Sequence, residues 1–427
     1  MSRLTVIGTG YVGLVTAACM AGLGHTVVGM DVDEEKVRRL QRGEIPIYEP
    51  GLAELVAEQG DRLVFTHDPV AAYSQGEFIF ICVDTPPTYS GDADLSRIWR
   101  VIDNLPPEDG ARVLITKSTV PVGTGAAIQA ELANRGYHHI SYCSNPEFLR
   151  EGLAISDFTR PDRVVIGAGI ETADRVAALY AGIDCPILKT TVASAEMIKY
   201  ASNAFLATKI SFINEIANVC EATGADVRVV ARGMGLDKRI GPHFLQAGMG
   251  YGGSCFPKDV SALKQLAGNS GYHFQLLNAV IEVNELQKRR VLGKLKRVLG
   301  PELRGCRVAL LGLAFKPHTD DIREASSIVL ASRLLAEGAN VVAYDPAAME
   351  NTRRLLPSVA YAASAIEALR GADACVLVTE WPEFVAMDWA EVYEVMKEPV
   401  VIDGRNALDA AELRTLGFSY QGVGTQL

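Results

Sequence analysis

The stretch Gly8-Thr9-Gly10-Tyr11-Val12-Gly13 follows a short apolar run and opens a helix-compatible segment that lasts to about Gly24. A second apolar run at 26–31 completes a strand–helix–strand pattern, which is the unit of a parallel sheet. In such a unit the first glycine permits a tight turn, the second lets backbone approach a pyrophosphate, and the third lets helix and strand pack closely. The N–H groups at the helix N-terminus then face the phosphates. The stretch therefore predicts a dinucleotide-binding domain of the Rossmann type.

Asp31 closes the second run about 20 residues after this motif, where a carboxylate accepts the hydroxyls of the adenosine ribose and favours NAD over NADP. Two alternatives exist. The first is a glycine-rich turn without a ligand. The second is a signal peptide or membrane helix, because residues 4–30 carry no charge unless His25 is protonated. The glycines that punctuate this stretch are explained by dinucleotide binding and not by a membrane segment.

The rest of the chain divides into an α/β part, a helical part and a second α/β part. Thirty residues from 193 to 222 contain neither Gly nor Pro, which predicts a long helix at the start of the middle part. On either side, apolar strand-like runs alternate with helical segments, as in open sheets that are covered on both faces. We predict two Rossmann-like doubly wound parallel-sheet domains joined by a central helical domain, with boundaries at 1–192, 193–299 and 300–427.

The composition excludes some classes of protein. A net charge of −10 over 427 residues argues against a general nucleic-acid binder, although a few cations in a pocket can still attract a small anion. The eight cysteines form no C-x-x-C pair and no zinc-like spacing with histidine, which is typical of reduced thiols in a cytoplasmic protein. The seven histidines include no H-x-x-x-H, and none lies at ligand spacing from carboxylates, so we expect no catalytic metal.

Cys255 differs from the other cysteines in its surroundings. It follows Gly250-Tyr251-Gly252-Gly253-Ser254 and precedes Phe256-Pro257-Lys258-Asp259. Because proline suits the first turn of a helix, Cys255 is expected at a helix N-terminus, where the dipole favours the thiolate. The glycines let a substrate approach, and Asp259 returns to the same side four residues later. The alternative is a buried structural cysteine after a flexible loop.

Two loops that follow strands are expected to line the cofactor, because ligands of doubly wound sheets bind beyond the carboxyl ends of the strands. They are 83–87, with Thr85 and Pro86, and 117–121, with Ser118 and Thr119. Ordinary turns ended by proline are the alternative.

Two carboxylates, Glu147 and Glu151, follow another strand and share a face if this segment is helical. Such a pair can position water or share a proton, whereas the alternative is a solvated first helical turn.

Three polar side chains on the expected long helix lie close to one face: Lys199, Asn203 and Glu196. A cation and an amide that converge can bind an oxyanion, although the polar stripe of an amphipathic helix is the simpler explanation. In the last part of the chain, Lys316 and Arg405 follow strands and could pair with phosphates, with surface salt bridges as the alternative.

Taken together, these residues resemble the UDP-glucose/GDP-mannose dehydrogenase family over nearly the whole chain. Five motifs occur in the family's order and spacing: Gly8–Gly13, Lys117–Pro121, Asn145–Gly152, Gly252–Asp259 and Phe315–Arg323. The resemblance implies an N-terminal NAD domain, a central dimerisation region and a C-terminal domain that holds the UDP-sugar. It also implies a four-electron oxidation that consumes two NAD, in which Cys255 forms a thiohemiacetal and then a thioester.

The family pattern assigns roles to individual residues of this sequence. The implied catalytic residues are Cys255, Lys199, Asn203, Asp259, Glu147 and Thr119. The implied NAD-binding residues are Gly8, Gly10, Tyr11, Val12, Gly13, Asp31, Lys36, Thr85, Pro86, Ser118, Thr119, Glu151 and Arg323. The implied substrate-binding residues are Glu147, Phe148, Leu149, Arg150, Lys199, Asn203, Arg239, Phe244, Gln246, Gly248, Tyr251, Gly252, Phe315, Lys316 and Arg405.

Two positions beside the cysteine indicate the branch of the family. Ser254 stands where the N-acetylmannosamine branch usually has His, and Phe256 stands where the GDP-mannose branch more often has Leu. We therefore expect UDP-glucose as substrate, with GDP-mannose or a UDP-N-acetylhexosamine as the alternative. At Lys36 relatives often carry Arg.

Three further expectations concern the kind of protein. Arg239 resembles an arginine that reaches a neighbouring subunit, so a homodimer or larger homo-oligomer is expected, with no nucleic-acid or membrane partner. The cysteine loop and the third part of the chain argue against a two-electron hydroxyacid-type dehydrogenase. The combination of Cys255, Lys199 and Asn203 argues against a non-catalytic nucleotide-binding module.

Overall fold

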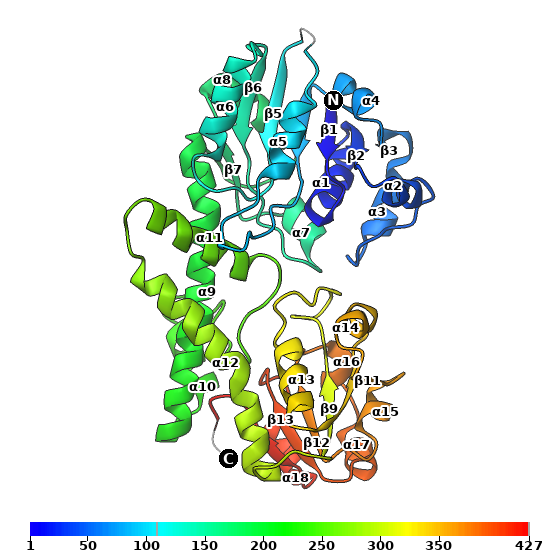
Figure 1. Ribbon diagram of the computed structural model, residues 1–427, viewed down its shortest axis with the longest axis vertical. Helices are drawn as coiled ribbons and strands as arrows, with labels where there is room; N and C mark the ends of the chain where they lie inside the picture. Colours follow the sequence, from blue (N-terminus) through cyan, green and yellow to red (C-terminus); the bar gives the residue numbers. More distant parts are fainter. Residues whose placement is uncertain (108–109, 426–427) are drawn as a thin grey trace. The chain divides into compact units, whose positions relative to one another are not determined.

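The computed structural model describes residues 1–107 and 110–425. The chain forms two compact units: Met1–Ser202 with Gln265–Gly271, and Asn203–Lys264 with Tyr272–Leu427. Each unit contains one sheet, which Figure 1 draws in blue to green for the first unit and in yellow to red for the second.

The first sheet has eight strands in the order β3-β2-β1-β4-β5-β6-β7-β8. The first six are mutually parallel and have the Rossmann strand order, whereas β7 runs antiparallel to β6 and parallel to β8. The strands are β1 (Arg3–Ile7), β2 (Thr26–Met30), β3 (Leu63–Thr66), β4 (Phe78–Ile81), β5 (Arg112–Thr116), β6 (Ile140–Ser144), β7 (Val164–Gly167) and β8 (Ile187–Thr190).

Helices cover both faces of this sheet. Alternate residues of a strand point to opposite faces, and they enter two separate hydrophobic cores: Val6 and Phe80 one, Ile7 and Ile79 the other. This is the burial expected of a doubly wound sheet. The helices are α1 (Tyr11–Gly22), α2 (Glu34–Gln41), α3 (Leu52–Gln59), α4 (Pro69–Gln75), α5 (Ser96–Asp103), α6 (Thr124–Asn134), α7 (Ala154–Thr159) and α8 (Ile170–Ala178), with a short 3-10 turn at Gly60–Arg62.

The middle of the chain is helical. The long helix α9 (Val192–Thr223) contains no Gly or Pro that would interrupt it and continues from the first unit into the second. It is followed by α10 (Val227–Gly235), whose first turn is capped by the Asp226 carboxylate accepting from the N–H of Arg228. Two more helices complete this part: α11 (Phe256–Asn269) and α12 (Gln275–Leu299).

The second sheet repeats the topology of the first six strands. Its order is β11-β10-β9-β12-β13-β14, and all pairings are parallel. The strands are β9 (Arg307–Leu311), β10 (Asn340–Tyr344), β11 (Ala360–Tyr361), β12 (Ala374–Leu377), β13 (Val400–Asp403) and β14 (Ser419–Gln421). The helices are α13 (Ser326–Ala336), α14 (Met349–Leu355), α15 (Ala365–Leu369), α16 (Pro382–Val385), α17 (Trp389–Val395) and α18 (Ala410–Thr415).

The predicted fold class is confirmed: two parallel α/β sheets with helices between them in sequence. The strands that the sequence did not indicate are short strands at or near sheet edges, such as β3, β8, β11 and β14. Such strands contain exposed residues, as half-exposed β8 does, so their apolar pattern in the sequence is weak. The expected all-parallel first sheet is corrected at β7, which joins β6 through the single pair Ser144 and Gly167.

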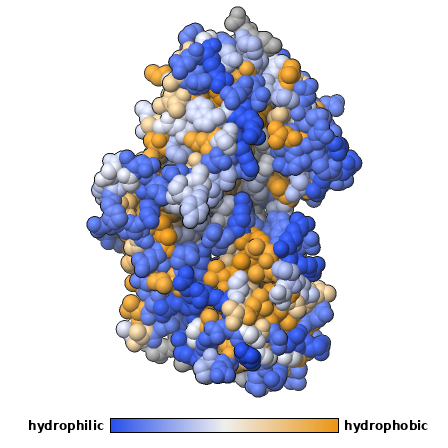
Figure 2. Space-filling model, viewed as in Figure 1, coloured by the Kyte–Doolittle hydropathy of each residue, from blue (hydrophilic) through white to orange (hydrophobic). Residues whose placement is uncertain are grey.

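The N-terminal stretch that resembled a membrane segment is β1, the twelve-residue α1 and β2. Within the described residues, no helix combines the length and the hydrophobicity that crossing a membrane requires. Figure 2 shows a face on which hydrophilic side chains predominate and apolar ones form small patches.

Candidate active site

A pocket of about 340 Å³ opens at the carboxyl end of the first sheet. It is bordered by the ends of β1 and β2, by the residues after β4, and by α4 and α5. Its lining includes Gly8, Gly10, Asp31, Lys36, Asp84, Arg97 and Arg100. Three basic side chains at the rim suit a pyrophosphate-containing ligand.

The three glycines have the distinct roles predicted for them. Gly8 has φ +91°, and a Cβ there would lie 2.8 Å from the Cys82 carbonyl oxygen. A Cβ at Gly13 would lie 1.8 Å from the Gly8 carbonyl oxygen, so only glycine lets α1 pack against this turn. Around Gly10 a Cβ would meet only Asp84, at 3.8 Å, which leaves the backbone open to the pocket. This cradle fits a dinucleotide.

Asp31 is fixed at the end of β2 in a form suited to bind ribose. Its Oδ2 accepts from the N–H and hydroxyl of Thr9, each at 2.9 Å, and from Lys36 Nζ at 2.9 Å. Burial raises the pKa of Asp31, but the hydrogen bonds from Lys36, Asp33 N–H and Thr9 N–H outweigh burial and hold it below its ordinary value. Asp31 is therefore a carboxylate at neutral pH, and Lys36 acts on it directly.

The two loops predicted to line the cofactor are bonded to each other. The Thr85 hydroxyl donates to the Thr119 carbonyl at 2.8 Å, and the Ser118 hydroxyl donates to the Val83 carbonyl at 2.6 Å. Thr85 and Ser118 are buried, whereas Pro86 and Thr119 are half-buried. The carboxyl ends of β4 and β5 are thus locked side by side, as the sheet order requires.

Tyr11 and Val12, the non-glycine residues of the motif, are half-buried. The Tyr11 hydroxyl contacts the Glu49 carboxylate, and both accept from the N–H of Gly152, at 3.0 and 2.6 Å. The Tyr11 hydroxyl therefore ties the glycine motif to the 145–152 loop.

Glu147 and Lys199 form a buried ion pair in the first unit. Lys199 Nζ lies 2.8 Å from Glu147 Oε1, and the two side chains are 5% and 6% exposed. The N–H of Leu149 donates to Glu147 Oε2 at 2.5 Å. Burial raises the pKa of Glu147, but the Lys199 charge and hydrogen bond, the Leu149 N–H and the Lys117 charge hold it below its ordinary value.

Glu147 and Glu151 would share a face only in a helix, and that condition is not met. Residues 145–150 are extended loop, and the next helix begins only at Ala154. Glu147 is buried, whereas Glu151 is half-exposed. The proline at 146 restricts the preceding backbone away from the helical region.

The neighbours of Glu147 on this loop differ in exposure. The Phe148 ring has the Arg163 guanidinium 3.7 Å from its centre and Lys199 Nζ at 5.5 Å. Leu149 is half-buried. Arg150 is exposed, and its guanidinium is bonded to Asp157 at 2.6 and 3.0 Å.

Cys255 stands immediately before α11, as the sequence predicts. The N–H of Asp259 donates to the Cys255 carbonyl at 2.8 Å, so the first turn of α11 is formed directly behind the cysteine. The Asp259 side chain is 1% exposed and accepts from Asn203 Nδ2 at 2.6 Å and from Lys258 Nζ at 2.7 Å. Lys258 thus compensates the Asp259 charge. The predicted placement of Cys255 and Asp259 on one helical turn is confirmed.

The glycine loop before Cys255 is held against 319–325 in the second unit. The N–H of Gly253 donates to the Arg323 carbonyl at 2.8 Å. A Cβ at Gly252 would lie 2.4 Å from the Glu324 carbonyl oxygen, and one at Gly253 would lie 2.8 Å from the Phe315 ring. Two glycines are therefore required by close backbone and ring packing.

Three amide side chains on the long helices fix the chain that leads into this loop. Asn214 Oδ1 accepts from the N–H of Gly248 at 2.8 Å, and Gln287 Nε2 donates to the Gly248 carbonyl at 2.8 Å. Asn284 bonds both backbone groups of Tyr251, at 2.8 and 3.0 Å. Tyr251 is buried and packs edge-on against Phe256, whose ring also lies 6.1 Å from that of Phe244. Gln246 is exposed.

The remaining candidate residues lie in the second unit and are distributed over several loops. Arg405 donates to the Val378 and Phe315 carbonyls, each at 2.6 Å, so this guanidinium shapes the Phe315–Lys316 loop. Lys316 Nζ lies 5.5 Å from the centre of the Phe315 ring. Arg323 and Arg239 are ion-paired with Asp321 and Asp237, and their side chains are 65% and 88% exposed.

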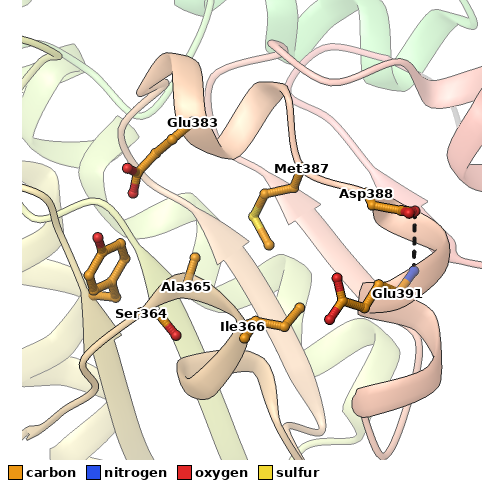
Figure 3. Close-up of a pocket in the computed structure, with 8 residues that line it drawn as sticks. Ser364, Ala365, Ile366, Glu383, Met387, Asp388 and Glu391 are labelled. Carbon is orange, nitrogen blue, oxygen red and sulfur yellow. Dashed lines mark hydrogen bonds between the residues drawn. The ribbon is translucent and has the colours of Figure 1, made fainter.

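A second pocket, of about 310 Å³, lies on the second sheet between the end of β10 and helices α15, α16 and α17 (Figure 3). Its labelled side chains include Glu383, Asp388 and Glu391, with Ile366 and Met387 between them. Asp388 is used locally, because its Oδ1 accepts from the N–H of Glu391 at 3.3 Å. The described lining of this pocket has carboxylates and no basic side chain to balance them, which does not suit a phosphate ligand.

Three family sequence profiles match successive parts of the chain. The NAD binding domain of the UDP-glucose/GDP-mannose dehydrogenase family matches residues 2–184, its central domain matches 193–286, and its UDP binding domain matches 309–410. The chain belongs to the UDP-glucose/GDP-mannose dehydrogenase family. The cofactor is NAD, for which the first pocket provides the fitting residues.

Relatives within the UDP-glucose/GDP-mannose dehydrogenase family match over nearly their full length. UDP-glucose 6-dehydrogenase TuaD of Bacillus subtilis is 46% identical over 99% of this chain and 93% of its own. UDP-glucose 6-dehydrogenase of Pseudomonas aeruginosa is 46% identical over 99% and 97%. The structure of a UDP-glucose dehydrogenase from the hyperthermophilic archaeon Pyrobaculum islandicum has a TM-score of 0.91 and 40% identity, covering 100% of this chain and 98% of its own.

Several residues that position the site of this family member were not indicated by the sequence. Glu49 binds the N–H groups of Gly152 and Ala154. Arg163 stacks on Phe148. Glu196, which the sequence placed near the face of Lys199, instead binds the N–H groups of Gly123 and Gly125. None of these contacts joins residues that are adjacent in sequence, so no local motif signals it. For Asn214, Asn284 and Gln287, a polar residue on an apolar helical face was the available signal.

Proposed function

We propose that this protein oxidises UDP-glucose to UDP-glucuronate with two NAD, through a thioester on Cys255. The observation that carries the proposal is Cys255 at the start of α11, backed by a buried Asp259 that Asn203 holds. Asn203 is one helical turn from Lys199 on α9, and Lys199 forms an ion pair with Glu147. The two proposed oxyanion donors, Lys199 and Asn203, therefore stand on one helix, and each is bonded to a buried carboxylate.

Bound NAD supplies the oxidising power, because it takes one hydride from C6 of the sugar in each of two oxidations. After the first oxidation the Cys255 thiolate adds to the aldehyde carbon, and the carbonyl π pair becomes an oxyanion. Lys199 and Asn203 are the donors we assign to that oxyanion, because a cation and an amide favour it over the neutral carbonyl. Loss of the second hydride then leaves the thioester.

Water completes the reaction. It adds to the thioester carbon, the carbon–sulfur bond breaks, and the products are a carboxylate and the Cys255 thiol. We assign Glu147 and Asp259, with Thr119, to orient this water and to accept protons. The balance is one alcohol, one water and two NAD to one carboxylate, two NADH and three protons. Glu147 can accept a proton because its ion pair keeps it ionised.

Further roles are proposed on the family pattern together with position. For NAD we assign Gly8, Gly10, Gly13, Asp31, Lys36, Thr85, Pro86 and Ser118, with Tyr11, Val12, Glu151 and Arg323. For the substrate we assign Phe148, Leu149, Arg150, Phe244, Gln246, Gly248, Tyr251, Gly252, Phe315, Lys316, Arg239 and Arg405. Arg405 would act through the Phe315–Lys316 loop whose carbonyl it binds.

The domain division at 192/193 and 299/300 is part of the proposal, since α9 begins at Val192 and α12 ends at Leu299. We also propose a homodimer. Phe205, Phe212 and Val219 are 65%, 49% and 56% exposed at a spacing of seven residues, so they form one apolar stripe on α9. The exposed Arg239 is available to a second subunit.

The proposed location is the cytoplasm. Cys19, Cys82, Cys143, Cys220 and Cys375 are buried free thiols, and Cys185 and Cys306 are half-buried free thiols. A chain with this many reduced thiols suits a reducing compartment.

A Cys255→Ala variant tests the covalent step. Steady-state NADH formation from UDP-glucose should fall at least about a thousandfold, because a nucleophile is removed, while NADH binding by fluorescence stays within about twofold. Cys306→Ala, another half-buried thiol, is the matched control and should keep full activity. Unchanged turnover in Cys255→Ala would exclude the thioester.

A further inference from the structure

Lys117 is a buried cation to which the reaction above gives no role. It is the first residue after β5, it is 4% exposed, and its backbone N–H donates to the Ile81 carbonyl at 3.0 Å. Its Nζ lies 5.9 Å from the centre of the Phe158 ring and 5.8 Å from that of Tyr180. Phe158 and Tyr180 belong to the hydrophobic core on one face of the first sheet. The ammonium therefore sits inside an apolar core.

The hydrogen bonds of this ammonium go to neutral oxygens. Nζ donates to Asn145 Oδ1 at 3.2 Å and to the Tyr180 hydroxyl at 3.3 Å. Among the residues that the structure describes, it pairs with no carboxylate. Burying a charge without a paired counter-charge is costly, and an apolar residue of the same size is often as stable or more stable. Stability alone therefore does not account for a lysine here.

Asn145, the acceptor of Lys117, is the anchor of the Glu147 loop. Its Oδ1 also accepts from the Tyr180 hydroxyl at 2.5 Å, and its Nδ2 donates to the Val165 carbonyl at 2.8 Å. Its backbone N–H donates to the Thr116 carbonyl at 2.9 Å. Glu147 follows two residues later, after a proline that limits the backbone. Because Asn145 is held in place by these bonds, it fixes the path of the backbone that leads to Glu147.

The thiols and the phenol around Lys117 are neutral. Burial raises the pKa of each of the thiols Cys19, Cys82 and Cys143 to about 12, although the Lys117 charge lowers it. Burial also raises the pKa of Tyr180. Glu147 is ionised and faces Lys199 directly, and the Lys117 charge adds to the same effect. The carboxylate that responds to Lys117 is therefore Glu147.

We propose that Lys117 is a positioning residue, which holds Glu147 in place as a carboxylate through the Asn145 anchor and through its own buried charge. This inference rests on the proposed function, because it assigns Lys117 an effect on the water-handling carboxylate. It uses contacts of the first unit only.

Lys117→Met tests the proposal, because methionine keeps the length of the side chain and removes the charge. With UDP-glucose and NAD, kcat should fall roughly tenfold while both KM values stay within about twofold, since the affected group handles water rather than binding. Loss of the cation raises the pKa of Glu147, so the low-pH limb of kcat should move to higher pH by about half a unit to one unit. The melting temperature should stay equal or rise.

Two further variants separate charge from fold. Tyr180→Phe removes the hydrogen bonds of the hydroxyl with Lys117 and Asn145 but keeps the ammonium, so the low-pH limb should not move. Asn145→Asp places a carboxylate on the ammonium and should move the limb upward as Lys117→Met does, even if that variant folds poorly. A Lys117→Met protein with unchanged kcat and pH profile would overturn the proposal, and so would a limb that moves to lower pH.

Different results would contradict the proposed function and the role of Lys117. A wild-type protein that oxidises no nucleotide sugar would remove the proposed function. The melting comparison needs no substrate and would still be informative. A clearly lower melting temperature in Lys117→Met, with an unmoved low-pH limb in Asn145→Asp, would make Lys117 a structural residue and overturn the inference.

Discussion

The two sheets of this chain share one strand order but treat the same place in the fold in opposite ways. In the first sheet the pocket between the second strand and the flanking helices is lined by three basic side chains, Lys36, Arg97 and Arg100, and by three acids, Asp31, Asp33 and Asp84. In the second sheet the corresponding pocket is lined by the acids Glu383, Asp388 and Glu391, with no basic side chain among its described lining residues (Figure 3). Topology supplies a crevice in both, and only the first has cations that can attract the phosphates of a dinucleotide.

In each sheet an acid follows the second strand, and these two acids differ in what they bind. Asp31 lies in the wall of its pocket and binds Thr9 and Lys36. Asp345 is completely buried, and its carboxylate accepts from four backbone N–H groups and from Trp381 Nε1 at 3.1 Å. One acid is available to a ribose, and the other is used to hold the sheet's own loops.

The largest expected effect concerns the glycine that both sheets share after their first strand. Gly8 and Gly312 have φ of +91° and +96°, and a Cβ would lie 2.8 Å from the Cys82 oxygen and 2.3 Å from Thr379 Cβ, respectively. Alanine at either position should lower the free energy of unfolding by about 3 kcal/mol, from backbone strain and overpacking. Urea unfolding measures both. Only Gly8→Ala should also weaken NAD binding, and equal NAD affinity in the two variants would break the comparison.

A medium effect is expected from substituting Asp31 and Asp345, the equivalent acids of the two sheets. Asp345→Asn should cost about 2 kcal/mol of stability, because several buried charge-assisted hydrogen bonds are weakened, and should leave NAD affinity unchanged. Asp31→Asn should weaken NAD binding about tenfold with a smaller stability loss. Thermal unfolding gives the stability of each variant, and NADH titration gives its cofactor affinity. A loss of NAD affinity in Asp345→Asn would contradict the division of roles.

A smaller effect is expected from reversing charge in each pocket. Arg100→Glu should reduce NAD affinity about threefold to fivefold at low salt, and 0.5 M salt should shrink the difference, because these charges are exposed. Glu391→Lys is the matched change in the second pocket and should leave NAD binding unaffected. Isothermal titration at two salt concentrations distinguishes the two results, and a salt-independent loss would point to misfolding instead of lost attraction.

The smallest effect is a difference in pH dependence. The Asp31 pKa is lowered in the folded state, so its contribution to stability is present above the unfolded value of about 3.9 and is lost as pH falls through the folded pKa. The Asp403 pKa is raised by burial, so its charge is unfavourable at neutral pH and that cost disappears as pH falls. Urea unfolding of Asp31→Asn and Asp403→Asn at pH 7 and at about pH 3 should therefore show opposite trends relative to wild type.

Local patterns predicted most of the fold. The glycine motif with Asp31 predicted the Rossmann-type first unit, and the absence of Gly and Pro after Val192 predicted the long helix α9. Cys255 was found because proline and glycine mark a helix start on the chain itself. Such features depend on neighbours in sequence, so a single chain reveals them.

The parts that the sequence did not reveal depend on distant neighbours. Glu49 binds Gly152 from 103 positions away, and nothing near either residue indicates that contact. The spacing of Glu147 and Glu151 suggested a helical pair, whereas Glu147 pairs with Lys199, 52 positions away. Arg405 looked like a phosphate ligand, yet two of its nitrogens donate to the Val378 and Phe315 carbonyls and it is ion-paired with Glu380. Buried polar contacts are satisfied in three dimensions, and their partners leave no period or motif.

The central claim is a four-electron oxidation at Cys255, and the most direct test is the amount of NADH formed per UDP-glucose consumed. Purified protein with excess NAD and limiting UDP-glucose would be followed by absorbance until the reaction stops, with the sugar product quantified separately. We expect two NADH per UDP-glucose and UDP-glucuronate as the product. One NADH per UDP-glucose, with an aldehyde as the product, would contradict the four-electron oxidation.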